Sequence, residues 1–148
     1  MSTRSGIGIY HKGNIHGIYS NSDGYISYVG YVLHNFYQNP EKILALVAQG
    51  DMSMLGMDIG YKVDFNDRLQ FVHIQDGSED GKHVAQQCRF YARDRGEHTP
   101  ARVYGSEHEF VNNIDGEYFY LYKDDQWFVD IGDGFRPVAD YFKTTEEA

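Results

Sequence analysis

The sequence has one cysteine, one tryptophan, three prolines and no long apolar run. A single cysteine, Cys88, excludes an intramolecular disulfide and favours a reducing compartment. No apolar stretch approaches the roughly 18 residues of a membrane span, and the first residues lack the apolar centre of a signal peptide. We therefore expect a cytoplasmic protein that does not associate with membranes.

Basic side chains are also scarce, with 13 Lys and Arg against 22 Asp and Glu, which gives a net charge of −9. This balance counts against direct binding to nucleic acid, because surplus Lys and Arg carry that interaction. Residues 105–148 hold 11 acidic and 3 basic side chains, so most of the negative charge lies there. Two interpretations stay open: a solvated surface that keeps the protein soluble, or a surface that meets a basic partner.

Motifs for metal binding and catalysis are missing. The seven histidines never occur at metal-ligand spacing, and the chain has no Gly-x-Ser-x-Gly, Gly-x-Gly-x-x-Gly or P-loop sequence. The segment 130–134 resembles part of a calcium loop but lacks the glutamate at its twelfth position, so it predicts a turn. Cys88 fits a buried core position better than a nucleophile. We expect no metal and no cofactor, and we lean against an enzyme.

The length of 148 residues and the 16% aromatic content predict one folded domain over residues 1–148. Hydrophobic spacing predicts helices over about 26–36, 40–49 and 106–113 and a short helical or irregular segment over 135–142. It predicts strands over 3–10, 15–19, 71–74, 87–91, 117–122 and 126–131, with turns at 11–14, 76–81 and 123–125. The order is not a strict alternation of strand and helix. It predicts an α+β fold, with an antiparallel sheet of about five or six strands and two or three helices packed on one face.

Two polar segments are candidates for ligand binding. Tyr19-Ser20-Asn21-Ser22-Asp23-Gly24-Tyr25 lies between a predicted strand and a predicted helix, where free backbone amides can bind an anion or where Ser22 or Asp23 can simply cap the helix. Arg93-Asp94-Arg95-Gly96-Glu97 places two arginines on one side of a strand, where they can hold a phosphate or a carboxylate unless the neighbouring carboxylates neutralise them. A pocket for a phosphorylated molecule would join Tyr19, Asn21, Asp23, Tyr25, Arg93 and Arg95.

Five segments together resemble a family of small proteins of uncharacterised function found in bacteriophages and in some bacteria. They are Tyr19 to Tyr25, similar to Tyr-x-His-Trp-Asp-Gly-Tyr; Val29-Gly30-Tyr31-Val32-Leu33; Gln49-Gly50-Asp51-Met52-Ser53-Met54-Leu55; Arg93 to Glu97; and the aromatic hairpin Glu117 to Val129. The chain departs from the first motif, with Asn21 in place of His and Ser22 in place of Trp. If those two side chains carry a family activity, this chain lacks it.

The resemblance implies a phage-encoded interaction protein that acts in the host bacterial cytoplasm, by analogy with inhibitors of defence systems such as CRISPR complexes. Its partner would be a host protein or ribonucleoprotein with a basic surface. The acidic residues expected to meet that surface are Glu107, Glu109, Asp115, Glu117, Asp124 and Asp125. The alternative is a binding protein or enzyme for a small phosphorylated ligand. A concave pocket that joins the two polar segments favours the alternative, and a flat or convex acidic face with no pocket favours the interaction protein.

Overall fold

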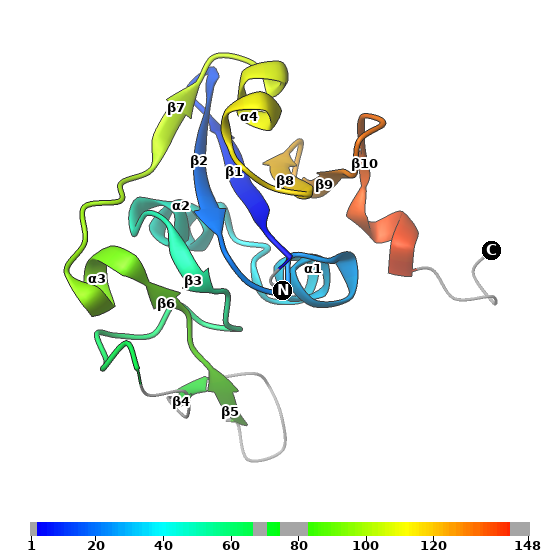
Figure 1. Ribbon diagram of the computed structural model, residues 1–148. Helices are drawn as coiled ribbons and strands as arrows, with labels where there is room; N and C mark the ends of the chain where they lie inside the picture. The colour runs from blue at the N-terminus through cyan, green and yellow to red at the C-terminus, as the bar shows by residue number, and fades with distance from the viewer. Residues whose placement is uncertain (1–2, 67–70, 75–82, 143–148) are drawn as a thin grey trace.

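The computed structural model describes residues 3–66, 71–74 and 83–142, and its centre is an eight-stranded mixed sheet (Figure 1). The strands run in the order β10-β9-β8-β1-β2-β3-β6, and β7 also pairs with β2. Their bounds are β1 Ser5–His11, β2 Asn14–Ser20, β3 Met52–Met54, β6 Arg89–Phe90, β7 Arg102–Tyr104, β8 Tyr118–Lys123, β9 Gln126–Asp130 and β10 Phe135–Pro137. A separate two-stranded ribbon consists of β4 (Phe71–Ile74) and β5 (His83–Gln86).

The predicted antiparallel sheet of five or six strands is wrong, because two of the strand pairs are parallel. β1 forms the expected antiparallel hairpin with β2, but its other edge pairs in parallel with β8, with Ser5 opposite Tyr118. β2 also pairs in parallel with β3. The β1–β8 pair joins strands near the two ends of the chain, so local periodicity does not indicate the parallel pairing. Strands of two or three residues are too short to show an alternating pattern, so local periodicity does not indicate these strands either.

Helices cover both faces of the sheet, which corrects the expectation that they pack on one face. The first core holds the π-helix η1 (Ile26–Gly30), α1 (Tyr31–Phe36), α2 (Pro40–Ala48) and the 3-10 helix η2 (Val138–Phe142). The second core holds α4 (Glu107–Asn113) through Phe110, which is fully buried. The short helix α3 (Tyr91–Arg95) follows β6 directly.

Glycines explain how α4 approaches the second face of the sheet. Gly8 and Gly17 are paired across β1 and β2. A Cβ atom at Gly17 would lie 2.8 Å from Cε1 of Phe110, and one at Gly8 would lie 3.1 Å from the same atom. Side chains at these positions would therefore displace Phe110. The two glycines thus leave the space that Phe110 of α4 occupies against the sheet. Hydrophobic periodicity in the sequence does not indicate this packing role of glycine.

Several local predictions are confirmed. Asn39 caps α2, since its side chain accepts a hydrogen bond from the Glu41 amide at 2.9 Å, and Ser106 caps α4 by accepting from the Glu109 amide at 3.1 Å. The β8–β9 hairpin turns at Asp124 and Asp125, both with positive φ. The predicted strand over 87–91 is wrong in its bounds, because β5 ends before it, β6 is two residues long and α3 begins at Tyr91. The predicted turn over 76–81 lies outside the described residues.

Trp127 links the C-terminal hairpin to the helices of the first face. Its side chain is 3% exposed, and Nε1 donates a hydrogen bond to the Tyr37 carbonyl at 2.8 Å, directly after α1. Tyr37 is itself fully buried, and its hydroxyl donates to the Gly56 carbonyl at 2.7 Å. Within the described ranges, no helix has the length and apolarity needed to cross a bilayer.

Trp127→Ala should lower the free energy of unfolding by about 3–5 kcal/mol, because it leaves a large cavity and removes the hydrogen bond to Tyr37. Gln126→Ala is the control, since Gln126 precedes Trp127 on β9 and is exposed. It should change stability by no more than about 0.5 kcal/mol. Urea unfolding measures both values, and a loss below about 1 kcal/mol for Trp127→Ala would contradict its place in the core.

Candidate anion-binding site

The polar segment after β2 is a rigid turn that leads into η1. The Asn21 amide donates to the Met52 carbonyl at 3.1 Å, which holds the start of the turn beside β3. The Gly24 amide donates to the Thr3 carbonyl at 2.8 Å, and the Gly24 carbonyl accepts from the buried Tyr120 hydroxyl at 2.6 Å. Both ends of the turn are therefore fixed to the sheet.

Asp23 lies between these fixed points in the left-handed region, with φ +54°. This conformation is uncommon outside glycine, although Asp and Asn tolerate it better than other residues. Tyr25 donates its hydroxyl to Asp23 Oδ1 at 3.2 Å, and the negative charge of Asp23 raises the pKa of Tyr25. Backbone conformations of this kind persist where the surroundings enforce them, and they are enriched at functional sites.

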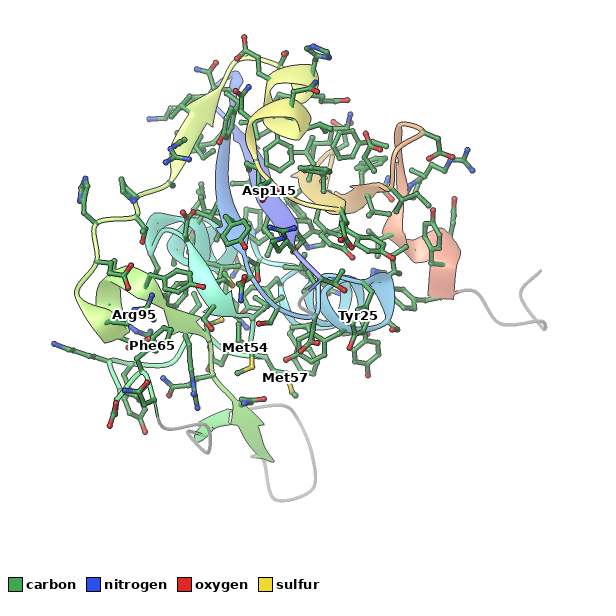
Figure 2. The ribbon with its side chains drawn as sticks, in the orientation of Figure 1. Tyr25, Met54, Met57, Phe65, Arg95 and Asp115 are labelled. Carbon is green, nitrogen blue, oxygen red and sulfur yellow. The ribbon has the colours of Figure 1, made fainter. Side chains whose placement is uncertain are left out.

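Asp23 lines a cavity of 300 Å³ between four segments of the chain. Ser22 and Asp23 come from the turn, Ser53 and Met54 from β3, Gln86 from the end of β5 and Arg89 from β6. Met54 and Arg89 are paired across β3 and β6, and Figure 2 shows Met54 at the end of β3, on the side toward the β4–β5 ribbon. The sheet thus brings an arginine to the segment that contains Asp23.

Arg89 is the most informative residue of this cavity. It is only 5% exposed, and its Nη1 donates to the Phe65 carbonyl at 3.2 Å, whereas Nε and Nη2 are buried and have no hydrogen-bond partner among the described residues. Arg89 takes part in none of the ion pairs found among the described residues. Burial of a charge without a partner is strongly unfavourable, so a buried guanidinium normally has an anionic partner.

Arg93 shows how the Nε and Nη2 atoms of a guanidinium bind when a carboxylate is present. Its Nη1 donates to the Ile59 carbonyl at 2.9 Å, just as Arg89 donates to Phe65. Its Nε and Nη2 donate to the two carboxylate oxygens of Asp94 at 3.0 and 3.2 Å. The Nε–Nη2 edge is the one that binds an oxyanion through two parallel hydrogen bonds. In Arg89 this edge has no partner in the described part of the chain and belongs to a residue that lines the cavity.

The structure does not join the predicted partners Asp23, Tyr25, Arg93 and Arg95 in one arrangement. Arg93 is used within the protein, and Arg95 forms an ion pair with Glu97 and lies over the ring of Phe65, 4.4 Å from its centroid. Figure 2 shows Arg95 with Phe65 beside α3, well separated from Tyr25 near α1. The two arginines belong to a helix rather than a strand, so they do not share one side.

Tyr19 and Asn21 contact each other and do not line the cavity that contains Arg89, called the Arg89 cavity below. The Tyr19 hydroxyl donates to Asn21 Oδ1 at 2.8 Å, and burial raises the pKa of Tyr19. Tyr19 lines a different cavity, of 240 Å³, together with Asp51 and Arg102. Of the six residues predicted for the ligand, Asp23 is therefore the one that the structure places at the Arg89 cavity.

The six predicted acidic residues are spread over two ends of the sheet. Asp115 pairs with Arg4 at 2.8 Å, Glu107 pairs with Lys123 at 2.7 Å, and Glu109 accepts from the Gly105 amide at 2.9 Å. Glu117 precedes β8 and Asp124 follows it, so the length of the strand separates them by about 20 Å. Glu107, Asp124 and Asp125 line a hollow of 550 Å³ at one end.

Cys88 occupies the buried core position that the sequence predicts. It is fully buried, its Sγ accepts from the Gly56 amide at 3.2 Å, and it contacts the Tyr37 hydroxyl at 3.4 Å. Burial raises the pKa of the Cys88 thiol to about 11, so the thiolate needed for nucleophilic attack is disfavoured. Among the residues that the structure describes, no group of three His, Cys, Asp or Glu side chains is placed to hold a metal ion.

Asp94→Ala should lower the free energy of unfolding by about 3–5 kcal/mol, because it removes the carboxylate from a buried ion pair and from the Phe90 and Val63 amides. Glu97→Ala breaks the exposed ion pair with Arg95 and should cost less than about 1 kcal/mol. Chemical unfolding of the two variants checks the difference. Equal losses would mean that the Arg93–Asp94 pair is not the structural element described here.

The chain matches no protein-family model, no curated protein and no solved structure. The resemblance to the phage-protein family therefore stays a prediction, which rests on the five sequence segments alone.

Proposed function

We propose that the protein binds a small molecule through an oxyanionic group, a phosphate or a carboxylate, held by Arg89. The observation that carries this proposal is Arg89, a buried residue that lines a cavity and whose Nε and Nη2 have no hydrogen-bond partner among the residues that the structure describes. An oxyanion on the Nε–Nη2 edge would supply both the missing charge and the two missing hydrogen-bond acceptors. A phosphorylated ligand is the class of the alternative hypothesis from the sequence; the proposal adds carboxylates and places Arg89 where the sequence suggested Arg93 and Arg95.

The rest of the cavity supports a small ligand. Its 300 Å³ lies at the lower end of the volumes of small-molecule sites. Ser22 and Ser53 can each donate a hydroxyl to an oxyanion, and the amide of Gln86 can donate or accept. The net charge of −9 does not oppose this proposal, because a buried guanidinium acts locally whereas distant surface carboxylates are screened by salt.

Arg89→Met should abolish phosphate binding without unfolding the protein. Met is apolar and of similar length, so the variant removes an unpaired buried charge, and its stability in phosphate-free buffer should equal or exceed that of wild type. Inorganic phosphate in 100-fold excess over its dissociation constant should stabilise wild type by about 2.7 kcal/mol and should leave Arg89→Met unchanged. Thermal unfolding at constant ionic strength, with chloride replacing phosphate, measures both effects.

Arg102→Met is the matched control, because it makes the same substitution at an exposed arginine that lines a different cavity. It should retain the full response to phosphate. Arg89→Lys keeps the positive charge but loses the paired edge, so it should bind phosphate more weakly than wild type. Phosphate binding by Arg89→Met at the wild-type level would contradict the proposal.

A second candidate is the interaction protein that the resemblance implies, an inhibitor of a host defence complex with a basic surface. The observation that favours it is the pair of exposed carboxylates, Asp124 and Asp125, at the tip of the β8–β9 hairpin, where they line a hollow of 550 Å³ together with Glu107. Exposed carboxylates at the tip of a hairpin can contact basic side chains of a partner. In this candidate function the contact residues lie at the end of β8 opposite to Glu117.

The double variant Asp124→Asn, Asp125→Asn tests this candidate. Asn tolerates the positive φ of both positions, so the hairpin should keep its turn. Association with a basic host partner isolated by the wild-type protein should fall at least tenfold, and the wild-type affinity should weaken as salt rises. Glu117→Gln, at the other end of β8, should bind like wild type. Unchanged binding of the double variant, measured by surface plasmon resonance, would exclude this hollow as the contact surface.

A further inference from the structure

We infer that the ligand of the Arg89 cavity carries an amine besides its oxyanion, and that Asp23 binds the amine. The ligand class is therefore a small zwitterion, such as an aminoalkyl phosphate or an amino carboxylic acid. This inference rests on the proposed function, because Arg89 must first hold the oxyanion. It adds the second charged group of the ligand and the residue that recognises it.

The carboxylate of Asp23 has unused acceptor capacity at this cavity. Oδ1 accepts the hydroxyl of Tyr25, whereas Oδ2 accepts none of the hydrogen bonds found among the described residues. An ionised carboxylate offers about four acceptor positions, so a single bond from Tyr25 leaves most of them available. Asp23 is only half-buried, so water can solvate its carboxylate, whereas Arg89 is buried.

Asp23 and Arg89 line the same cavity without forming an ion pair within 4.0 Å. The backbone prevents Asp23 from shifting easily toward Arg89, because the amides of Asn21 and Gly24 hold the turn on both sides. The Asp23 carbonyl also accepts a hydrogen bond from the Val29 amide at 3.3 Å. Asp23 and Arg89 thus line one cavity with their charged atoms more than 4.0 Å apart.

Electrostatic complementarity then limits the kind of ligand. A phosphate without a counter-charge is attracted by Arg89 but repelled by Asp23 in the same cavity. A ligand with both an oxyanion and an ammonium group satisfies both residues, and each contact is a charge-assisted hydrogen bond. The cavity volume of 300 Å³ limits the connection between the two groups to a short one.

Two pairs of probes isolate the contribution of the amine. Phosphoethanolamine and ethyl phosphate share the phosphate and differ by the amine. β-Alanine and propionate share the carboxylate and also differ by the amine. Isothermal titration calorimetry at constant ionic strength gives the dissociation constant of each probe. Wild type should bind the amine-bearing member at least tenfold more tightly in one pair or both, and the pair with the tighter binding identifies the oxyanion.

Asp23→Asn removes the charge with little change in shape. Asn tolerates the φ of +54° and keeps an oxygen that can accept from Tyr25. This variant should bind the two members of each pair within about threefold of one another and should bind ethyl phosphate at least as tightly as wild type does. Asp124→Asn is the matched control, because Asp124 has a φ of +52° but lies at the β8–β9 turn. It should keep the wild-type preference for the amine.

The outcomes separate this inference from the proposed function. If ethyl phosphate or propionate binds wild type but the amine gives no tenfold advantage, the inference about Asp23 is wrong and the role of Arg89 stands. If the amine gives the advantage and Asp23→Asn retains it, another group recognises the amine and the inference is again wrong. If none of the four probes binds wild type, both the proposed function and the inference fail.

Discussion

The insertion of β1 between β2 and β8 is the constraint from which the rest of the structure follows. It makes the first strand of the chain central, with an antiparallel partner on one edge and a parallel partner on the other. The two sheet faces then receive different helices, with α1 and α2 on one face and α4 on the glycines of the other. It also positions the end of β2 beside β3, and β3 pairs with β6. Asp23 and Arg89, far apart in the sequence, meet at one cavity for this reason.

Within this frame, two arginines four residues apart have different roles. Arg93 is satisfied by Asp94 and by the backbone carbonyls of Ile59 and Cys88, so it connects α3 to the segment before it. Arg89 has the same contact to a carbonyl through Nη1, but no carboxylate of the described residues lies on its other edge. A buried charge without a partner lowers stability, and proteins retain such groups mainly where function requires them. Arg89 is therefore the one of these two arginines at which we propose a ligand.

The sequence predicted the local elements better than their arrangement. Strong signals such as the Asn39 and Ser106 caps and the aromatic β8–β9 hairpin correspond to observed elements, because each depends on residues close in the chain. The parallel β1–β8 pair depends on contacts between the chain ends, and no local pattern reports it. The same reason explains the site. Asp23 can be recognised in the sequence because it lies in a polar turn. The sequence around Arg89 contains no such signal, and only the pairing of the strands places Arg89 at the same cavity as Asp23.

The side-chain Nε–Hε resonances of the arginines test the central claim most directly. An oxyanion on the Nε–Nη2 edge of Arg89 would form a new charge-assisted hydrogen bond at Nε, so we expect the Arg89 signal to move downfield and sharpen in a titration with phosphoethanolamine. The Arg93 signal should not move, because Asp94 already occupies the same edge. Assignment of the signal by its loss in Arg89→Lys makes the readout specific to one atom. An Arg89 resonance that stays in place while phosphoethanolamine shifts other signals of the protein would contradict the account.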